Sequence, residues 1–338
     1  MNNTKVNNVL YKTVGFMNCD SSFYKSLLNS NYEKKYFDDE TINFLQNSYY
    51  SEYLNLMFKD KSSSVEIFSK KVNYQIGIEK RENDVILSCV DLYIFNNSNN
   101  NTKTSIFSIT YKPTDFSLHE ISNISNDLKN HNCEISYNSK KLLLIEFISQ
   151  HLFFGKKISG INTSLAQYSG SKFKNYLVLD FDDISIDRNQ LLYELGTSSK
   201  LGTIKNSTIH APSDSYVNYI LENKISCFKN YECLTLLNSF TVIGSNNYDE
   251  NHVHTHTTWN DIYFSIYIFN LYVKSSLQVI LNDFTSDAMV KRKEFQDFYN
   301  KYYFRKISYN FLPNEFFKRI ANSLELEEDL DFNENKLE

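Results

Sequence analysis

Polar and hydrophobic residues alternate along three stretches of the first third of the chain. In Ser64–Lys80, Val85–Phe95 and Ser105–Tyr111, β-branched and aromatic residues tend to take every second position, the pattern of strands with one buried face. The polar break Arg81–Asp84 favours a hairpin turn. Before these strands, Thr41–Phe58 has apolar residues at helical spacing. These patterns predict an α+β fold with a mixed or antiparallel sheet.

The middle of the chain adds helices and one more strand. Thr114 is a candidate N-cap for a helix reaching Asn130, and a second helix is predicted over Lys140–Phe154. The apolar run Asn175–Phe181 predicts a buried strand, and Arg188–Leu195 predicts a helix. We assign these elements to an α/β body at residues 1–212.

Beyond residue 212 the patterns predict helices only. They cover Ser213–Asn223, Ser226–Phe240, Trp259–Phe284, Asp287–Lys306 and Pro313–Leu326. The longest has apolar residues three and four positions apart, at 262, 266, 269, 273, 277 and 280. Such a stripe indicates a packing seam. The body is therefore followed by a helical C-terminal region at 213–324, and 325–338 is either an acidic tail or the start of a continuing helix.

The charge of the chain is concentrated at its end. The net charge is −5, and Glu325–Glu338 alone holds seven acidic residues and one lysine, or −6, which leaves +1 for the rest. Bulk binding to a nucleic-acid backbone requires a clustered positive surface. A nearly neutral body therefore argues against that function.

Cysteines and apolar runs indicate the compartment. The five cysteines include no Cys-x-x-Cys pair, which argues against a disulfide framework or a zinc ribbon. The first residues lack a signal-peptide pattern, and the longest uncharged apolar run, between Asp261 and Lys274, has 12 residues, whereas a membrane span needs about 20. We expect a cytoplasmic protein, with membrane contact only if the chain continues beyond Glu338.

Two acidic residues at a strand end are a candidate catalytic pair. Asp180 and Asp182 resemble the nucleophile motif of haloacid-dehalogenase-type phosphotransferases, in which one Asp attacks phosphorus and the other is the acid/base near Mg²⁺. Ile184–Ile186 depart from that motif. The alternative is a strand end whose acids cap the helix beginning near Asp187.

Three histidines form a candidate metal site. In an extended segment, His252, His254 and His256 lie on one side, and neutral imidazole binds zinc, copper or nickel. The cofactor would then be a divalent metal ion. The alternative is a solvated polar loop.

A basic loop is a candidate anion or nucleotide site. Its hydroxyls and cations are Ser169, Ser171, Lys172 and Lys174. An ordinary surface loop is the alternative. Among the cysteines, only Cys133 has a histidine close in sequence, His131.

The helical region resembles a known family. Its segments NYECLTLLNSFTVIG, TWNDIYFSIYIFNLYVKSSLQVILNDF and FYNKYYFRKISYNFLPNEFFKRIANSLELEEDL follow an α/β body, an order similar to the cytoplasmic part of CorA-like divalent-cation channels. The Gly-Met-Asn signature and the membrane helices of that family are absent from this sequence. The resemblance implies a homo-oligomer that senses a ligand and thereby controls metal ion transport. In some relatives the ligand is a nucleotide-like signal of an antiviral defence system.

Two functions follow as hypotheses. The first is a non-enzymatic, oligomerising ligand-sensing module. The second is a metal-dependent hydrolase or phosphotransferase that uses Asp180 and Asp182 or the histidines. Metal content and solution mass distinguish them.

Overall fold

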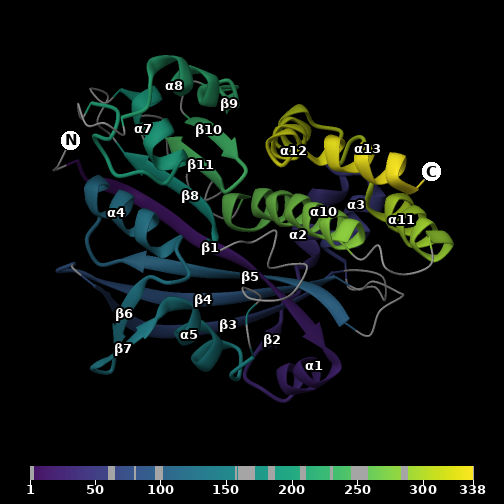
Figure 1. Ribbon diagram of the computed structural model, residues 1–338, viewed down its shortest axis with the longest axis horizontal. Coiled ribbons are helices and arrows are strands. Elements are labelled where there is room, and N and C mark those ends of the chain that lie inside the picture. Colours follow the sequence, from purple (N-terminus) through teal and green to yellow (C-terminus); the bar gives the residue numbers. More distant parts are fainter. Residues whose placement is uncertain are drawn as a thin grey trace.

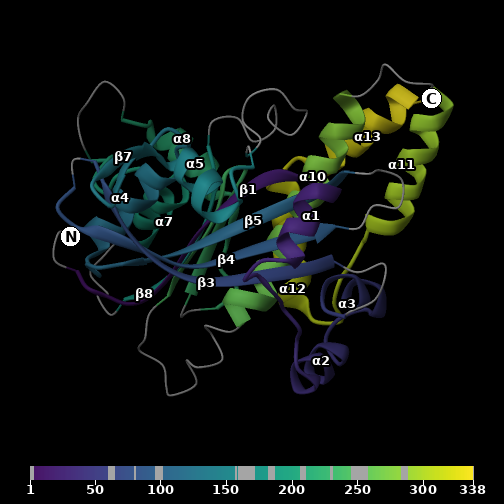
Figure 2. The same cartoon turned by 90° about the horizontal axis from the view of Figure 1, so that it is seen from below.

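A computed structural model describes most of the chain. The described residues are 4–59, 65–79, 81–95, 102–156, 158, 172–181, 187–205, 211–228, 231–244, 258–282 and 288–337. They form one mixed sheet of eleven strands with helices on both of its faces (Figures 1 and 2). The α+β prediction is confirmed.

The sheet runs in the order β7-β6-β3-β4-β5-β1-β8-β11-β10-β9, and β2 pairs with β3. Its strands are β1 (Val6–Asp20), β2 (Glu33–Lys34), β3 (Val65–Ile78), β4 (Asp84–Phe95), β5 (Thr102–Pro113), β6 (Glu134–Tyr137), β7 (Lys140–Leu143), β8 (Lys174–Phe181), β9 (Lys224–Ile225), β10 (Tyr231–Leu236) and β11 (Ser239–Gly244). The pairs are antiparallel except β8 with β11, which is parallel. The predicted strands of the first third are β3, β4 and β5, and the predicted hairpin joins β3 to β4.

The described helices fall into two groups. Those of the body are α1 (Ser21–Leu28), α2 (Asp39–Gln46), α3 (Ser51–Met57), α4 (Leu118–Leu128), α5 (Leu144–Phe147), the π-helical η1 (Ile148–Leu152), α7 (Arg188–Gly196) and α8 (Asp214–Leu221). Those of the helical layer are the π-helical η2 (Thr258–Tyr263), α10 (Phe264–Asn282), α11 (Ala288–Tyr302), α12 (Phe311–Ser323) and α13 (Leu326–Leu337).

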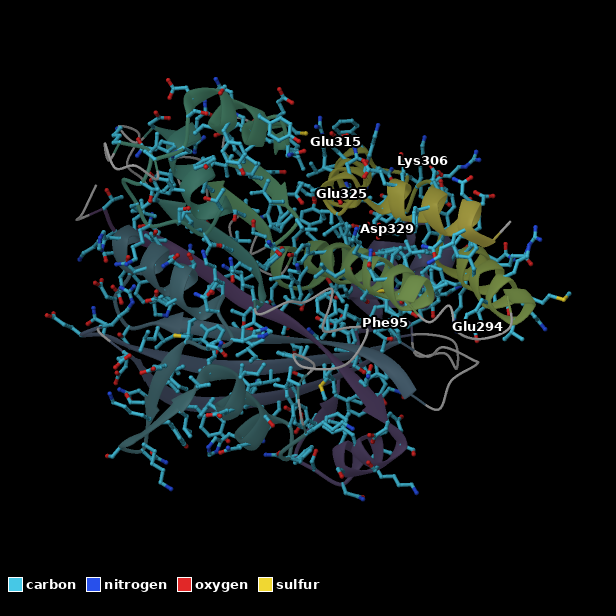
Figure 3. The ribbon with its side chains drawn as sticks, viewed as in Figure 1. Phe95, Glu294, Lys306, Glu315, Glu325 and Asp329 are labelled. Carbon is cyan, nitrogen blue, oxygen red and sulfur yellow. The ribbon has the colours of Figure 1, made fainter. Side chains whose placement is uncertain are left out.

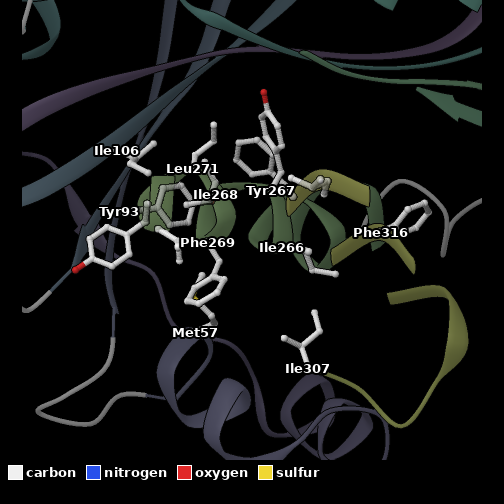
Figure 4. Close-up of a cluster of buried hydrophobic side chains, with 14 of the residues drawn as sticks. Met57, Tyr93, Ile106, Ile266, Tyr267, Ile268, Phe269, Leu271, Ile307 and Phe316 are labelled. Atoms are coloured by element: carbon white, nitrogen blue, oxygen red, sulfur yellow. The ribbon is translucent and has the colours of Figure 1, made fainter. Parts of the chain in front are cut away.

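The sheet has a hydrophobic core on each face. Along β1, Val14 and Phe16 belong to the core shared with the helical layer, whereas Tyr11 and Met17 belong to the core under α4 and α7. Successive side chains of a strand point to opposite faces, so one central strand contributes to both cores. In Figure 4, α10 lies between sheet residues such as Tyr93 and helix α3, which carries Met57.

The helical layer is built on the seam of α10. Ile266, Phe269 and Leu277 are almost fully buried, as the spacing predicts. Asp329 of α13 lies between α13 and α10 (Figure 3), where its carboxylate is 2.9 Å from the Lys274 ammonium. The acidic segment is therefore a packed helix, and the solvated tail is not what the structure shows. Among the described residues, no helix combines the length and apolarity that crossing a membrane requires.

One predicted helix is wrong. Ser226–Phe240 contains instead the hairpin of β10 and β11, and the prediction of helices only beyond residue 212 fails with it. The reason is tertiary: β11 pairs with β8, Phe240 opposite Tyr176, and its side chains complete both cores. Packing overrides local propensity at such a site.

Other boundaries differ locally. The helix predicted from Lys140 begins only at Leu144, because β7 first returns along β6 through a turn with positive φ at Asn138 and Ser139. The helix predicted over Thr41–Phe58 is split into α2 and α3. The cap of α4 is Ser117 rather than Thr114.

Candidate functional site

A polar cleft opens over α4, at one end of the sheet. It has a volume of about 760 Å³, and we call it the α4 cleft. Its lining comes from the end of β3 and the following turn, from one face of α4, from the segment before β6 and from the turn after α7. The lining residues are Ile78, Glu79, Arg81, His119, Asn123, Asp127, Asn130, Asn132, Cys133, Glu134 and Lys200.

The amphipathic pattern of α4 places its polar residues at the cleft. His119, Asn123 and Asp127 are four residues apart and therefore lie on one face of the helix. Apolar residues of the other face, such as Ile124, are buried in the core. Ser117 starts the helix by accepting a hydrogen bond from the Glu120 amide.

An arginine joins the β3–β4 turn to this helix. Arg81 Nε donates to Asp127 Oδ2 at 2.6 Å, and its Nη1 is 3.7 Å from Glu120 Oε2. Glu120 is buried, and burial raises its pKa although Arg81 opposes the rise. The contacts of Arg81 with Asp127 and Glu120 fix one wall of the cleft and place a cation and carboxylates there.

The histidine of the cleft contacts an amide one helical turn away. Asn123 Nδ2 lies 3.0 Å from His119 Nδ1. His119 is exposed, so its ring can contact a bound molecule.

Cys133 and His131 are not an activated nucleophile and base. Burial lowers the pKa of His131 to about 4, and its ring packs 4.2 Å from that of Phe173. Burial, assisted by Asp127, raises the pKa of Cys133 to about 12. Near neutral pH the imidazole is neutral and the thiol protonated, so this pair lacks the thiolate that thiol chemistry requires.

One end of the predicted basic loop lies beside the α4 cleft. Lys172 forms a β-bridge with Asn130, which lines the cleft. Lys129, next to Asn130, donates to the Ser198 carbonyl at 2.7 Å. Burial, together with Lys172, lowers the pKa of Lys129.

Lys174 of that loop does not line the cleft. Lys174 is buried on the face toward the helical layer and donates to Asn238 Oδ1 at 2.5 Å. Burial lowers its pKa to about 8, with Lys274 adding to the effect. Ser169 and Ser171 lie outside the described residues. Lys172 and Lys174 therefore have different partners, Asn130 and Asn238.

Asp180 of the predicted acidic pair does not line the cleft. Asp180 lies near the far end of β8, on the order of 25 Å along the strand from Lys172. The N-cap of α7 is Asp187, which accepts from the Gln190 amide at 3.1 Å, whereas the alternative assigned the cap to the acids at the strand end; of these, Asp182 lies outside the described residues.

The histidine cluster also lies outside the described part of the chain: His252, His254 and His256 are not placed. Within the described ranges, no group of three or more His, Cys, Asp or Glu side chains is arranged to hold a metal ion.

Sequence reasoning missed most of the α4 cleft. The signal for three of its residues was present, as the polar stripe at 119, 123 and 127. The contributions of Arg81 and Lys200 come from turns whose approach to α4 depends on the tertiary fold.

Comparison of the chain with protein-family models, curated proteins and solved structures found no match.

Proposed function

We propose that this chain is a non-enzymatic, cytoplasmic ligand-sensing module that binds a small nucleotide-like molecule in the α4 cleft and self-associates through its helical layer. The observation that carries the proposal is the cleft itself. Ten of its eleven lining residues have polar side chains or a thiol, and its volume of about 760 Å³ lies in the range of small-molecule sites.

The chemistry of the lining favours recognition over reaction. Asn123, Asn130 and Asn132 bring side-chain amides to the lining, a group that pairs with base edges and sugar hydroxyls. The Nδ2 groups of Asn123 and Asn130 already bond to His119 and to the carbonyls at the end of α4. Lys200 offers a cation for a phosphate. The protonated thiol of Cys133 supports binding rather than thiolate chemistry.

The charges of the cleft restrict the ligand. The lining carries two cations, Arg81 and Lys200, and three carboxylates, of which Asp127 is paired with Arg81. Because the carboxylates outnumber the cations, a ligand with one phosphate fits better than one with three, which would meet more repulsion.

Self-association is supported by apolar surface on the helical layer. Met289 of α11 is 80% exposed and Phe332 of α13 is 58% exposed. The two helices contact each other, and a contiguous exposed apolar patch marks an interaction site. The expected product is a homo-oligomer, as the resemblance to CorA-like cytoplasmic regions implies.

The test is calorimetric titration of the full chain with adenosine, AMP and ATP. We expect AMP to bind and ATP to bind more weakly. Asn123→Leu removes an amide from the cleft wall and should weaken both adenosine and AMP roughly tenfold. Lys200→Gln should weaken AMP by about threefold and leave adenosine unchanged.

The matched control is Lys25→Gln on α1, an exposed lysine away from the cleft, which should bind AMP like the parent chain. Light scattering and metal analysis complete the test. Absence of binding at millimolar AMP and adenosine would refute the ligand assignment, and a monomer with stoichiometric metal would favour the phosphotransferase instead.

A further inference from the structure

A second cavity lies inside the helical layer, apart from the α4 cleft. It has a volume of about 740 Å³ and is enclosed by α10, α12, α13 and the segment from Tyr302 to Phe311. We call it the α12 cavity. Its walls come from the helical layer, whereas the α4 cleft is built from the body, so the two cavities share no lining residue.

A buried amide in this cavity is half satisfied. Asn270 of α10 lines the cavity and has an exposed fraction of 0%. Its Nδ2 donates to the Ile266 carbonyl at 2.9 Å, while its Oδ1 has no hydrogen-bond partner among the described residues. A buried acceptor without a donor is costly. A ligand N–H or O–H group would satisfy it.

The walls beside Asn270 are aromatic. Phe269 contacts Phe304 and Phe317, with ring centroids 5.5 and 6.2 Å apart. Phe304 and Phe317 are only partly buried, so their rings remain accessible to a molecule in the cavity. Flat apolar groups pack well against such rings.

The rim of the cavity carries an excess of cations. Arg305, Lys306 and Lys318 are exposed there, together with two carboxylates. One of these, Glu315, accepts from Arg319 Nε at 2.9 Å. Lys306 and Glu315 both lie on the α12 and α13 side of the layer (Figure 3). The rim therefore favours an anionic group.

From these three features we propose that the α12 cavity binds an aromatic organic anion that carries an N–H or O–H donor. The donor bonds to Asn270 Oδ1, the aromatic body packs against Phe304 and Phe317, and the anionic group lies at Arg305, Lys306 and Lys318. This site is independent of the nucleotide proposal for the α4 cleft.

Two probes of nearly equal shape separate the contribution of the N–H donor from those of the aromatic body and the anionic group. Indole-3-acetate has the aromatic body, the carboxylate and an N–H, and 1-naphthaleneacetate replaces the N–H part with hydrocarbon. In calorimetric titrations of the full chain, indole-3-acetate should bind about fivefold more tightly. Asn270→Leu should abolish this preference, because the acceptor is gone.

A pair of lysine variants locates the site. Lys318→Gln at the rim should weaken both probes about threefold at low salt. Lys293→Gln, an exposed lysine of α11 that does not line the cavity, is the control and should leave both affinities unchanged.

Three outcomes overturn the proposal: no preference for indole-3-acetate in the parent chain, a preference that survives Asn270→Leu, or equal effects of the two lysine variants. Absence of binding at millimolar probe overturns it as well. If Asn270→Leu does not fold, the parent chain's preference and the lysine pair still decide. None of these results depends on AMP binding, so this proposal and the proposed function can fail separately.

Discussion

Removing one partner of the buried ion pair on the sheet face that packs against α10 should destabilise the fold strongly. Lys12 of β1 and Asp91 of β4 are 1% and 5% exposed, and their Nζ and Oδ2 atoms are 3.5 Å apart. Asp91 also accepts from Ser69 Oγ at 2.8 Å. The ammonium lies 4.3 Å from the ring centroid of Phe264 on α10. Asp91→Ala leaves this cation buried without its carboxylate.

The magnitude follows from the distance and the burial. At 3.5 Å and an effective dielectric constant of about 20, the Coulomb attraction is about 5 kcal/mol. Breaking such a buried pair costs about 3–5 kcal/mol. Replacing both partners, as in Lys12→Met with Asp91→Leu, removes the desolvation of both charges and should cost about 1 kcal/mol or less.

The same pair predicts a pH dependence. Burial alone would raise the pKa of Asp91, but Lys12, Lys35 and the Ser69 hydrogen bond outweigh it and hold the pKa below its usual value. A depressed pKa in the folded state stabilises the fold at pH values above the unfolded-state pKa of about 3.9. This stabilisation is lost as the pH falls through the folded-state pKa. The difference in free energy of unfolding between the parent chain and Asp91→Ala should therefore be constant from pH 7 to about 5 and become smaller in stronger acid.

Urea unfolding followed by circular dichroism measures the free energy of unfolding of each variant at each pH. The parent chain, Lys12→Met, Asp91→Leu and the double variant that combines these two substitutions form a double-mutant cycle. A double variant as unstable as the sum of the singles would show that the two groups do not interact. A loss below about 1 kcal/mol for Asp91→Ala would refute the burial argument.

Three further predictions concern packing. Ile266→Asp places a carboxylate at a position that is 0% exposed, and thermal unfolding should show a loss of several kcal/mol; an unchanged melting temperature would contradict the seam. Deleting Glu325–Glu338 removes α13 and exposes Lys274 and α10, so the melting temperature should fall clearly, whereas an unchanged value would mean that α13 adds little. Gly15→Ala directs a methyl group into the ring of Phe107 and should cost about 1–3 kcal/mol in urea unfolding, unlike an alanine at the exposed Ser22.

The elements with regular patterns were predictable from the sequence. β3, β4 and β5 each have stretches with one polar and one apolar face, and α10 has a continuous apolar stripe. β1 escapes such reasoning because both of its faces are covered: Val14 and Met17 are each 0% exposed, so no alternation marks it. β10 and β11 escape it because their pairing with β8 depends on residues distant in sequence.

The site was less predictable than the fold. Lys172 was a candidate, and it lies beside the α4 cleft. Asp180 was a candidate too, but its place near the opposite end of β8 keeps it out of the cleft. In the α10 stripe, Asn270 is one polar residue in an apolar helix, and its proposed role rests on its Oδ1 atom, which has no hydrogen-bond partner among the described residues.

The position of β1 has a consequence for biosynthesis. This strand is synthesised before both of its neighbours, β5 and β8, and Val14 pairs with Lys174. At about 5–20 residues per second, its second partner is made on the order of ten seconds later. Until then a long apolar strand has an unpaired edge, the condition that favours aggregation and chaperone binding. Folding of the sheet is therefore tied to the completion of most of the chain.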